Sequence, residues 1–142
     1  MSGTRERYYR ILFWIAAVYD ITLGLVFLFF SEPAFELLDA ENRLPDQGAF
    51  VSLIAAFLFV IGIAYVLIAR GDLLRNRDLI AIGALYKLAY TSVAVYYLVI
   101  GEYPDLAFVA VFGLADLVFF VLMTECWLYL GRLDPEENRA TS

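Results

Sequence analysis

Residues 11–30 of the chain read ILFWIAAVYDITLGLVFLFF, and Asp20 is the only charged side chain in this run. A helix rises about 1.5 Å per residue, so crossing about 30 Å of bilayer hydrocarbon takes about 20 residues. Three arginines precede the run, as they would in a signal peptide. The run is too long for a signal peptide, however, is interrupted by Asp20 and lacks a small-x-small cleavage motif. We therefore predict a retained transmembrane helix.

Three further runs of similar character follow at residues 50–69, 79–100 and 106–130. The chain has 142 residues, of which 63% are hydrophobic and 18% are charged. Soluble domains are nearer half apolar and a quarter charged, and here the charges fall mainly between the runs. The sequence predicts an all-α fold, an integral membrane four-helix bundle that forms a single domain over residues 1–142.

The loops between the runs differ in their basic residues. Eight arginines lie before the first run, between the second and third, and after the fourth: Arg5, Arg7, Arg10, Arg70, Arg75, Arg77, Arg132 and Arg139. The other two loops contain one arginine, Arg43, and are otherwise acidic. The positive-inside rule then predicts that both termini are cytoplasmic, in a bacterial or archaeal inner membrane. We interpret the net charge of −6 as sidedness, and no basic stripe indicates a nucleic-acid partner.

Two absences limit the chemistry. The chain has no His, so haem ligation by His, His-type zinc sites and His proton shuttles are excluded. Its single cysteine, Cys126, permits neither an internal disulfide nor a C-x-x-C redox pair. We predict no cofactor, no metal site and no catalytic residues. An enzyme that uses Asp, Glu, Lys or Tyr for proton transfer on a lipid-soluble substrate is conceivable but not indicated.

The loop over residues 31–49 begins SEPAFELLD at Ser31, which predicts a short helix. Ser31 could cap it and Pro33 suits its first turn. Phe35, Leu37 and Leu38 would rest on the outer membrane interface while the acids face water. The segment is either an ordered connector or a lid over a cavity that opens outward.

An internal repeat relates the two halves of the chain. The segment RILFWIAAVYD at residues 10–20 aligns with RDLIAIGALYK at residues 77–87, and the aligned segments end at Asp20 and Lys87. Pro-Asp pairs precede the second and fourth runs. Either the matches arise by chance, or two tandem helical hairpins are related by a pseudo-twofold axis normal to the membrane.

Three charged residues reach a common depth. Asp20 and Lys87 each lie ten residues past an arginine at the start of their run, and Asp116 lies eleven past the acid before its own run on the opposite side. A charge near the bilayer centre costs about 2.5–3.5 kcal/mol, so each must face the interior, pair or become neutral. We predict that Lys87 lies between the two carboxylates. One proton shared by the carboxylates would make the trio neutral, and the three groups would titrate as a coupled set.

The predicted ligand-binding or proton-relay site comprises this cluster and nearby phenols, since buried hydroxyls need partners. Its members are Asp20, Lys87, Asp116, Tyr19, Tyr86 and Tyr90, with Tyr65 and Tyr97 as secondary members. Small residues on the same faces, such as Gly62, Gly83 and Gly113, would let the helices approach.

Glu125 is a further secondary candidate that stands apart. It lies nine residues past Asp116, on nearly the opposite side of the helix and closer to the cytoplasmic interface. We expect it to snorkel, or to bond to Tyr129 or Arg132. A second step of a proton path, or a contact in an oligomer, are the alternatives.

The layout resembles the DoxX-like group of small bacterial four-helix membrane proteins. The resemblance rests on the four short spans, the acidic first loop, and the residues Tyr19-Asp20, Asn76-Arg77-Asp78 and Tyr86-Lys87. Some members are associated with membrane redox complexes, so the resemblance implies an accessory or small-ligand role.

Three roles remain open for the buried charges. They could bind the polar head of a small amphiphile, such as an isoprenoid, quinone or lipid, for proton-coupled binding or transport. They could instead be structural glue in a non-catalytic accessory or scaffold subunit of a larger membrane complex. A covalent role for Lys87 is the third, although four helices are few for enclosing a long polyene. The expected partners are the lipid bilayer, a lipid-soluble small molecule, and a homo-oligomer or larger complex.

Overall fold

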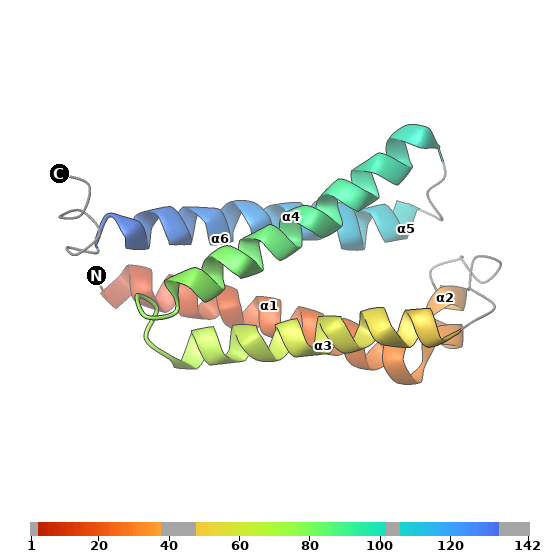
Figure 1. Ribbon diagram of the computed structural model, residues 1–142, viewed down its shortest axis with the longest axis horizontal. Helices are drawn as coiled ribbons and strands as arrows, with labels where there is room; N and C mark the ends of the chain where they lie inside the picture. The colour runs from red at the N-terminus through yellow and green to blue at the C-terminus, as the bar shows by residue number, and fades with distance from the viewer. Residues whose placement is uncertain (1–2, 38–47, 102–105, 134–142) are drawn as a thin grey trace.

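The computed structural model describes residues 3–37, 48–101 and 106–133, and every element in these ranges is helical (Figure 1). The elements are α1 (Gly3–Phe29), α2 (Ser31–Leu37), α3 (Gly48–Arg70), α4 (Arg77–Ile100), α5 (Leu106–Phe108), the π-helical η2 (Val109–Ala115) and α6 (Asp116–Gly131). Four of the helical stretches are long and apolar enough to cross a membrane, namely α1, α3, α4 and the run from η2 through α6. The chain is therefore a multi-pass membrane protein by length and composition.

The four predicted runs coincide with these stretches, but α1 begins earlier than predicted, at Gly3 instead of residue 11. Two features stabilise the added turns. Glu6 and Arg10 form an i, i+4 ion pair at 2.9 Å, which is the favourable order for such a pair. Tyr9 is buried against the end of α6. The polar composition of residues 3–10 therefore kept a helical segment that packs against α6 out of the predicted span.

The short helix predicted after the first run is present as α2 and follows α1 almost directly. Its Phe35 ring packs edge-on against Phe27 of α1, with the ring centroids 6.0 Å apart. Phe35 is thus half-buried against the protein, whereas Leu37 is 88% exposed. Leu38 lies outside the described residues, and the role of α2 as a lid stays a prediction.

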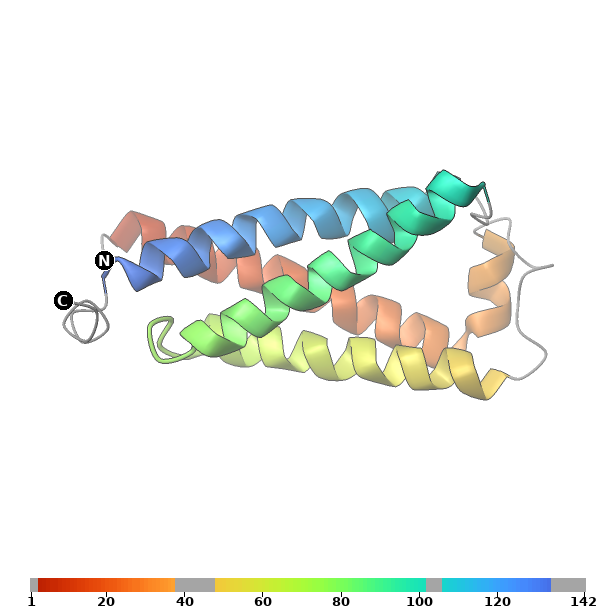
Figure 2. The same ribbon diagram turned by 45° about the horizontal axis from the view of Figure 1, so that its top comes forward.

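The long helices form two antiparallel pairs (Figures 1 and 2). We call α1 with α3 the first hairpin, and α4 with η2 and α6 the second hairpin. In both views α4 crosses the molecule obliquely and diverges from α3 toward its C-terminal end. The start of α1 and the end of α6 lie at the same end of the molecule. The two hairpins follow each other in the chain, as the repeat predicts, but the pseudo-twofold relation stays a prediction.

Backbone contact at two glycines holds the first hairpin together. A Cβ atom at Gly24 would lie 2.7 Å from the backbone nitrogen of Phe59, and one at Gly62 would lie 2.8 Å from that of Ile21. Real side chains do not approach backbone that closely, so only glycine fits at these two crossings. Helices in membranes commonly associate through such small residues, because close approach maximises van der Waals contact.

Two apolar clusters lie at opposite ends of the interior, and a polar layer separates them. The cluster near the chain termini includes Phe13, Ile80 and Met123, and the other includes Phe27 and Phe112. Between them, Asp20, Lys87, Thr91 and Asp116 are the buried polar side chains among the described residues. Only 28–33% of each apolar span is buried inside the protein, so most of its side chains face outward, as lipid contact requires.

Candidate functional site

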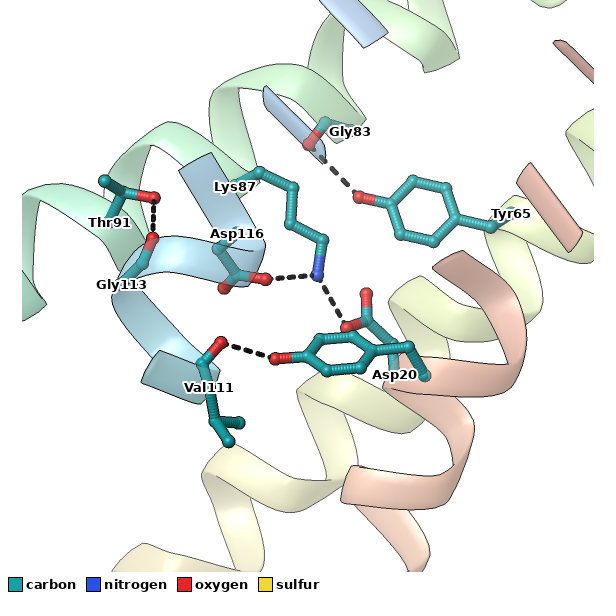
Figure 3. A network of polar contacts seen from close by, with 9 residues as sticks. Asp20, Tyr65, Gly83, Lys87, Thr91, Val111, Gly113 and Asp116 are labelled. Atoms are coloured by element: carbon teal, nitrogen blue, oxygen red, sulfur yellow. Dashed lines mark hydrogen bonds and ion pairs between the residues drawn. The ribbon is translucent and has the colours of Figure 1, made fainter. Parts of the chain in front are cut away.

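The polar layer is built around the ammonium group of Lys87 (Figure 3). Its Nζ donates to Asp20 Oδ1 of α1 at 2.6 Å and to Asp116 Oδ1 at the start of α6 at 2.9 Å. All three side chains are almost completely buried, at 0%, 0% and 2% exposure for Lys87, Asp20 and Asp116. The convergence predicted from equal depths is therefore confirmed. The cluster joins the hairpins, because Asp20 belongs to the first and the other two residues to the second.

Aromatic rings surround the same ammonium group. The Lys87 Nζ lies 4.9 Å from the ring centroid of Tyr19, 5.3 Å from Phe119, 5.6 Å from Tyr86 and 5.9 Å from Tyr65. Each ring presents negative quadrupole density to a cation within about 6 Å, an attraction that strengthens when the group is desolvated. With the lysine counted as a cation, the cluster sets one formal positive charge against two carboxyl groups.

Two of the phenol groups around the cluster donate to backbone carbonyls of the second hairpin. Tyr19 donates to Val111 O at 2.6 Å, and Tyr65 donates to Gly83 O at 3.1 Å. Gly83 is required for the second contact, because a Cβ there would lie 2.7 Å from the Tyr65 ring. These bonds satisfy two phenols that would be costly to bury without partners.

The π-helical segment η2 lies directly before Asp116 and supplies acceptors to the site. Val111 O accepts from Tyr19, and Gly113 O accepts from the hydroxyl of Thr91 on α4 at 3.3 Å (Figure 3). A π-helix shifts the backbone bonds to i→i+5 and so changes which carbonyls are left for other donors; such segments often lie at functional sites. Here the irregular segment, the buried acid and the hydroxyl donors adjoin.

Two atoms in this layer have no hydrogen-bond partner among the described residues, Asp20 Oδ2 and the Tyr86 hydroxyl oxygen. Asp20 Oδ2 is buried, and no donor within the described ranges reaches it, although Oδ1 of the same carboxyl is held by Lys87. Leaving a buried acceptor unpaired costs about 1–3 kcal/mol, and more if the group is charged. A donor from a bound molecule would remove that cost, and a proton on Asp20 Oδ2 would remove the negative charge that increases it.

The remaining predicted residues lie at increasing distances from the cluster. Tyr90 stacks on Tyr86 with the ring centroids 4.7 Å apart, and its ring is 6.4 Å from that of Phe112. Tyr90 therefore lies next to the charged cluster, on the side of the apolar cluster that contains Phe27 and Phe112. Tyr97 lies ten residues beyond Lys87, is 41% exposed and packs on Tyr96. The structure does not bring Tyr97 to the cluster.

Glu125 has a different partner from those predicted. Its Oε1 accepts a hydrogen bond from the hydroxyl of Tyr9 at 2.9 Å, not from Tyr129 or Arg132. The reason is the early start of α1, which carries Tyr9 alongside the last turns of α6. As predicted, Glu125 is remote from the cluster. It lies toward the end of the molecule at which α1 begins and α6 ends, which we call the basic end because Arg5, Arg10 and Arg132 lie there.

Three contributors were missed at the level of sequence: Thr91, Phe119 and the Val111 carbonyl. Thr91 is four residues past Lys87, so helical spacing already places it on the same face. Phe119 is likewise three residues past Asp116 and shares its face. The Val111 carbonyl had no such signal, because the spacing of side chains does not show which backbone carbonyl accepts a side-chain donor.

No metal-binding arrangement is found in the part of the chain that the structure describes, since no three His, Cys, Asp or Glu side chains are grouped there. Cys126 is buried and free, within the apolar cluster near the termini. What the site can do chemically is hold a polar group or exchange a proton between carboxyls.

Comparison with protein-family models, with curated proteins and with solved structures gives no match to this chain.

Proposed function

We propose that the four long helices form one membrane bundle of two hairpins, with both termini in the cytoplasm. The contacts at one end of the molecule support this orientation. Arg10 donates to the carbonyl of Ala69 at 2.7 Å, which ties the start of α1 to the end of α3. Arg70 and Arg77 pack on Trp14 and Trp127 at that same end. Arginines clustered on one side with tryptophans beside them are typical of a cytoplasmic membrane interface.

We further propose that the protein binds a small amphiphile at the cluster of Asp20, Lys87 and Asp116, with binding coupled to a proton on the carboxyl pair. The ligand is a lipid-soluble molecule of the isoprenoid, quinone or lipid class. Its polar group donates to the cluster and its apolar part lies along the aromatic side chains next to it. In this scheme the exchangeable proton and the ligand's donor compete for one oxygen.

The observation that carries this proposal is the unpaired Oδ2 of Asp20. If the charges served only to fix the helices, one lysine and one aspartate would suffice, and their pair would be neutral. The second carboxyl adds a desolvation cost and leaves an acceptor without a donor. Buried ionisable groups of this kind mark ligand or proton pathways in membrane proteins.

The test is the content of the purified protein. We expect that organic extraction and mass spectrometry will detect a stoichiometric lipid-soluble molecule with the wild-type chain. The variants Asp20→Asn and Asp116→Asn each leave Lys87 with one acid, so they keep a matched pair and should fold. Both should lose the bound molecule, whereas Glu36→Gln, which changes an exposed acid of α2, should retain it.

The proton has a separate readout. A protonated carboxylic acid gives an infrared C=O stretching band that a carboxylate lacks. We expect such a band in the ligand-free protein, its loss in Asp20→Asn, and its retention in Glu36→Gln. Full retention of both the bound molecule and the band in the two aspartate variants would refute the proposal.

An accessory role is the alternative, and it is what the resemblance to DoxX-like proteins implies. In that case the cluster holds the hairpins together and the exposed apolar faces meet partner helices. Purification in a mild detergent, followed by identification of co-purifying chains, separates the two. A stoichiometric partner protein without a bound small molecule would favour the accessory role.

A further inference from the structure

A second concave site lies at the basic end of the molecule, outside the cluster described above. It is a hollow of about 410 Å³ between the start of α1 and the last turns of α6. The lining residues are Arg5, Phe120, Val121, Thr124, Glu125, Leu128, Tyr129 and Arg132. We call this hollow the arginine groove, and we propose that it binds the phosphate head of an anionic glycerophospholipid from the adjoining leaflet.

The groove changes from basic to apolar along α6. Arg132 directly follows the helix, while Phe120 and Val121 lie about three turns deeper, and α6 is long enough to make this about 16 Å of depth. A phospholipid has the same order, with a charged head at the interface and acyl chains below. A lipid placed with its phosphate at the arginines would therefore lay a chain along the apolar residues.

The two arginines can both act on a phosphate. Neither guanidinium has an ion-pair partner within residues 3–37, 48–101 and 106–133, although Arg10 nearby is paired with Glu6. The Arg5 guanidinium carbon lies 4.4 Å from the Tyr129 ring centroid. Stacking uses the face of the guanidinium and leaves the N–H donors at its edge, which is the arrangement that suits a phosphate oxygen.

Glu125 determines the net charge of the arginine groove and the depth at which a phosphate would bind. It lies seven residues before Arg132, or about 10 Å deeper along the helix, and Tyr9 holds its carboxylate in place. An acid at that depth repels a phosphate that moves inward, so the anion is kept at the arginines. The formal charges of Arg5, Arg132 and Glu125 sum to +1, which complements the single negative charge of a phosphodiester. A choline head would add a cation next to two arginines, so an anionic lipid is preferred.

The experiment uses the full chain in detergent micelles and native mass spectrometry, with phosphatidylglycerol and phosphatidylcholine as the probes. Wild-type protein should bind phosphatidylglycerol more tightly. The double variant Arg5→Gln, Arg132→Gln should lose about thirtyfold in that affinity, or roughly fivefold for each arginine at an anionic headgroup. Arg75→Gln is the matched control, because Arg75 is an exposed arginine outside the groove and the Asp72 side chain bonds only its backbone nitrogen. The control should bind like the wild type.

Three results would overturn the proposal. One is equal binding of the two lipids by the wild type, and another is unchanged binding by a double variant whose helix content and elution volume are normal. The third is displacement of phosphatidylglycerol by inorganic phosphate at similar concentration, since the acyl chains would then contribute nothing. The ligand-extraction result for Asp20→Asn is independent of all three, because Asp20 lies in the other site.

Discussion

Two helix interfaces of this molecule are stabilised by different kinds of contact. We call the interface between α1 and α3 the glycine seam, and the interface between the two hairpins the polar seam. Within the first hairpin, α1 and α3 meet backbone to backbone at Gly24 and Gly62, and Arg10 donates a hydrogen bond to the Ala69 carbonyl at one end of the pair. Between the hairpins, hydrogen bonds cross from one side to the other in addition to the apolar packing. Tyr9, Tyr19 and Tyr65 of the first hairpin each donate to an acceptor on the second, and Lys87 donates back to Asp20.

The difference suggests which seam is permanent and which can open. Glycine contacts are rigid, because the helices cannot shift without losing van der Waals contact along the whole crossing. Hydrogen bonds can be exchanged with water or with the polar head of a ligand at little net cost. Toward the C-terminal end of α4, this helix diverges from α3 (Figure 2). A ligand or proton that reaches the cluster would act on the polar seam.

The largest effect should follow removal of the cation at the centre of the polar seam. Replacing Lys87 with Met leaves two facing carboxyls without a counter-charge, and breaking a buried pair in this way costs about 3–5 kcal/mol. The free energy of unfolding, measured by circular dichroism during titration with sodium dodecyl sulfate, should fall by that amount. The triple variant Lys87→Met, Asp20→Asn, Asp116→Asn should recover most of the loss. A loss below about 1 kcal/mol for Lys87→Met would mean that the cluster does not hold the hairpins.

The glycine seam should respond to a single methyl group. In Gly24→Ala the new Cβ would meet the Phe59 nitrogen and the Ala55 carbonyl at 2.7 and 2.9 Å, so α1 and α3 must separate. We expect a loss of about 1–3 kcal/mol in the same unfolding measurement. Gly48→Ala is the control, because it adds the same methyl group on the partner helix α3, where a Cβ would have nothing within 4 Å. Equal stability of the two variants would contradict close backbone contact at Gly24.

The parts of this structure that follow from counting residues could be predicted, and the parts that depend on helix phase or backbone register could not. The spans and the common depth of Asp20, Lys87 and Asp116 follow from a fixed rise per residue and a fixed bilayer thickness. The partner of Glu125 was missed because it depends on where α1 begins. The turns before residue 11 are polar in sequence, and the buried Tyr9 is among the contacts that stabilise them.

The π-helical turn before Asp116 is the other part that sequence does not reveal. Residues 109–115 read VAVFGLA, which contains no proline and nothing else that would distinguish it from an ordinary apolar helix. Two carbonyls of this segment accept from the hydroxyls of Tyr19 and Thr91. The buried charges were therefore predictable, whereas the carbonyls beside them were not.

Individual phenol bonds of the polar seam should each contribute little. Tyr65→Phe removes the donor to Gly83 O but keeps the ring that fills the space beside Gly83. Interhelical hydrogen bonds in membranes average about 0.6 kcal/mol, with a maximum near 1.7 kcal/mol. We expect a loss in this range for Tyr65→Phe, and none for Tyr96→Phe, whose ring is 60% exposed. Identical behaviour of the two variants would show that the Tyr65 hydroxyl does not join the hairpins.

The weakest link of the polar seam should be the bond from Tyr9 to Glu125, because the Glu125 side chain is exposed at the edge of the arginine groove. Exposed polar pairs contribute about 0–1 kcal/mol. A double-mutant cycle with Tyr9→Phe and Glu125→Gln should therefore give a coupling energy below about 0.5 kcal/mol, smaller than for any bond of the buried layer. The same cycle run on Lys87 and Asp20 should give several times more. If the coupling at Glu125 were the larger, the polar seam would be anchored at its basic end, and the buried cluster could not be the point at which the hairpins are held together.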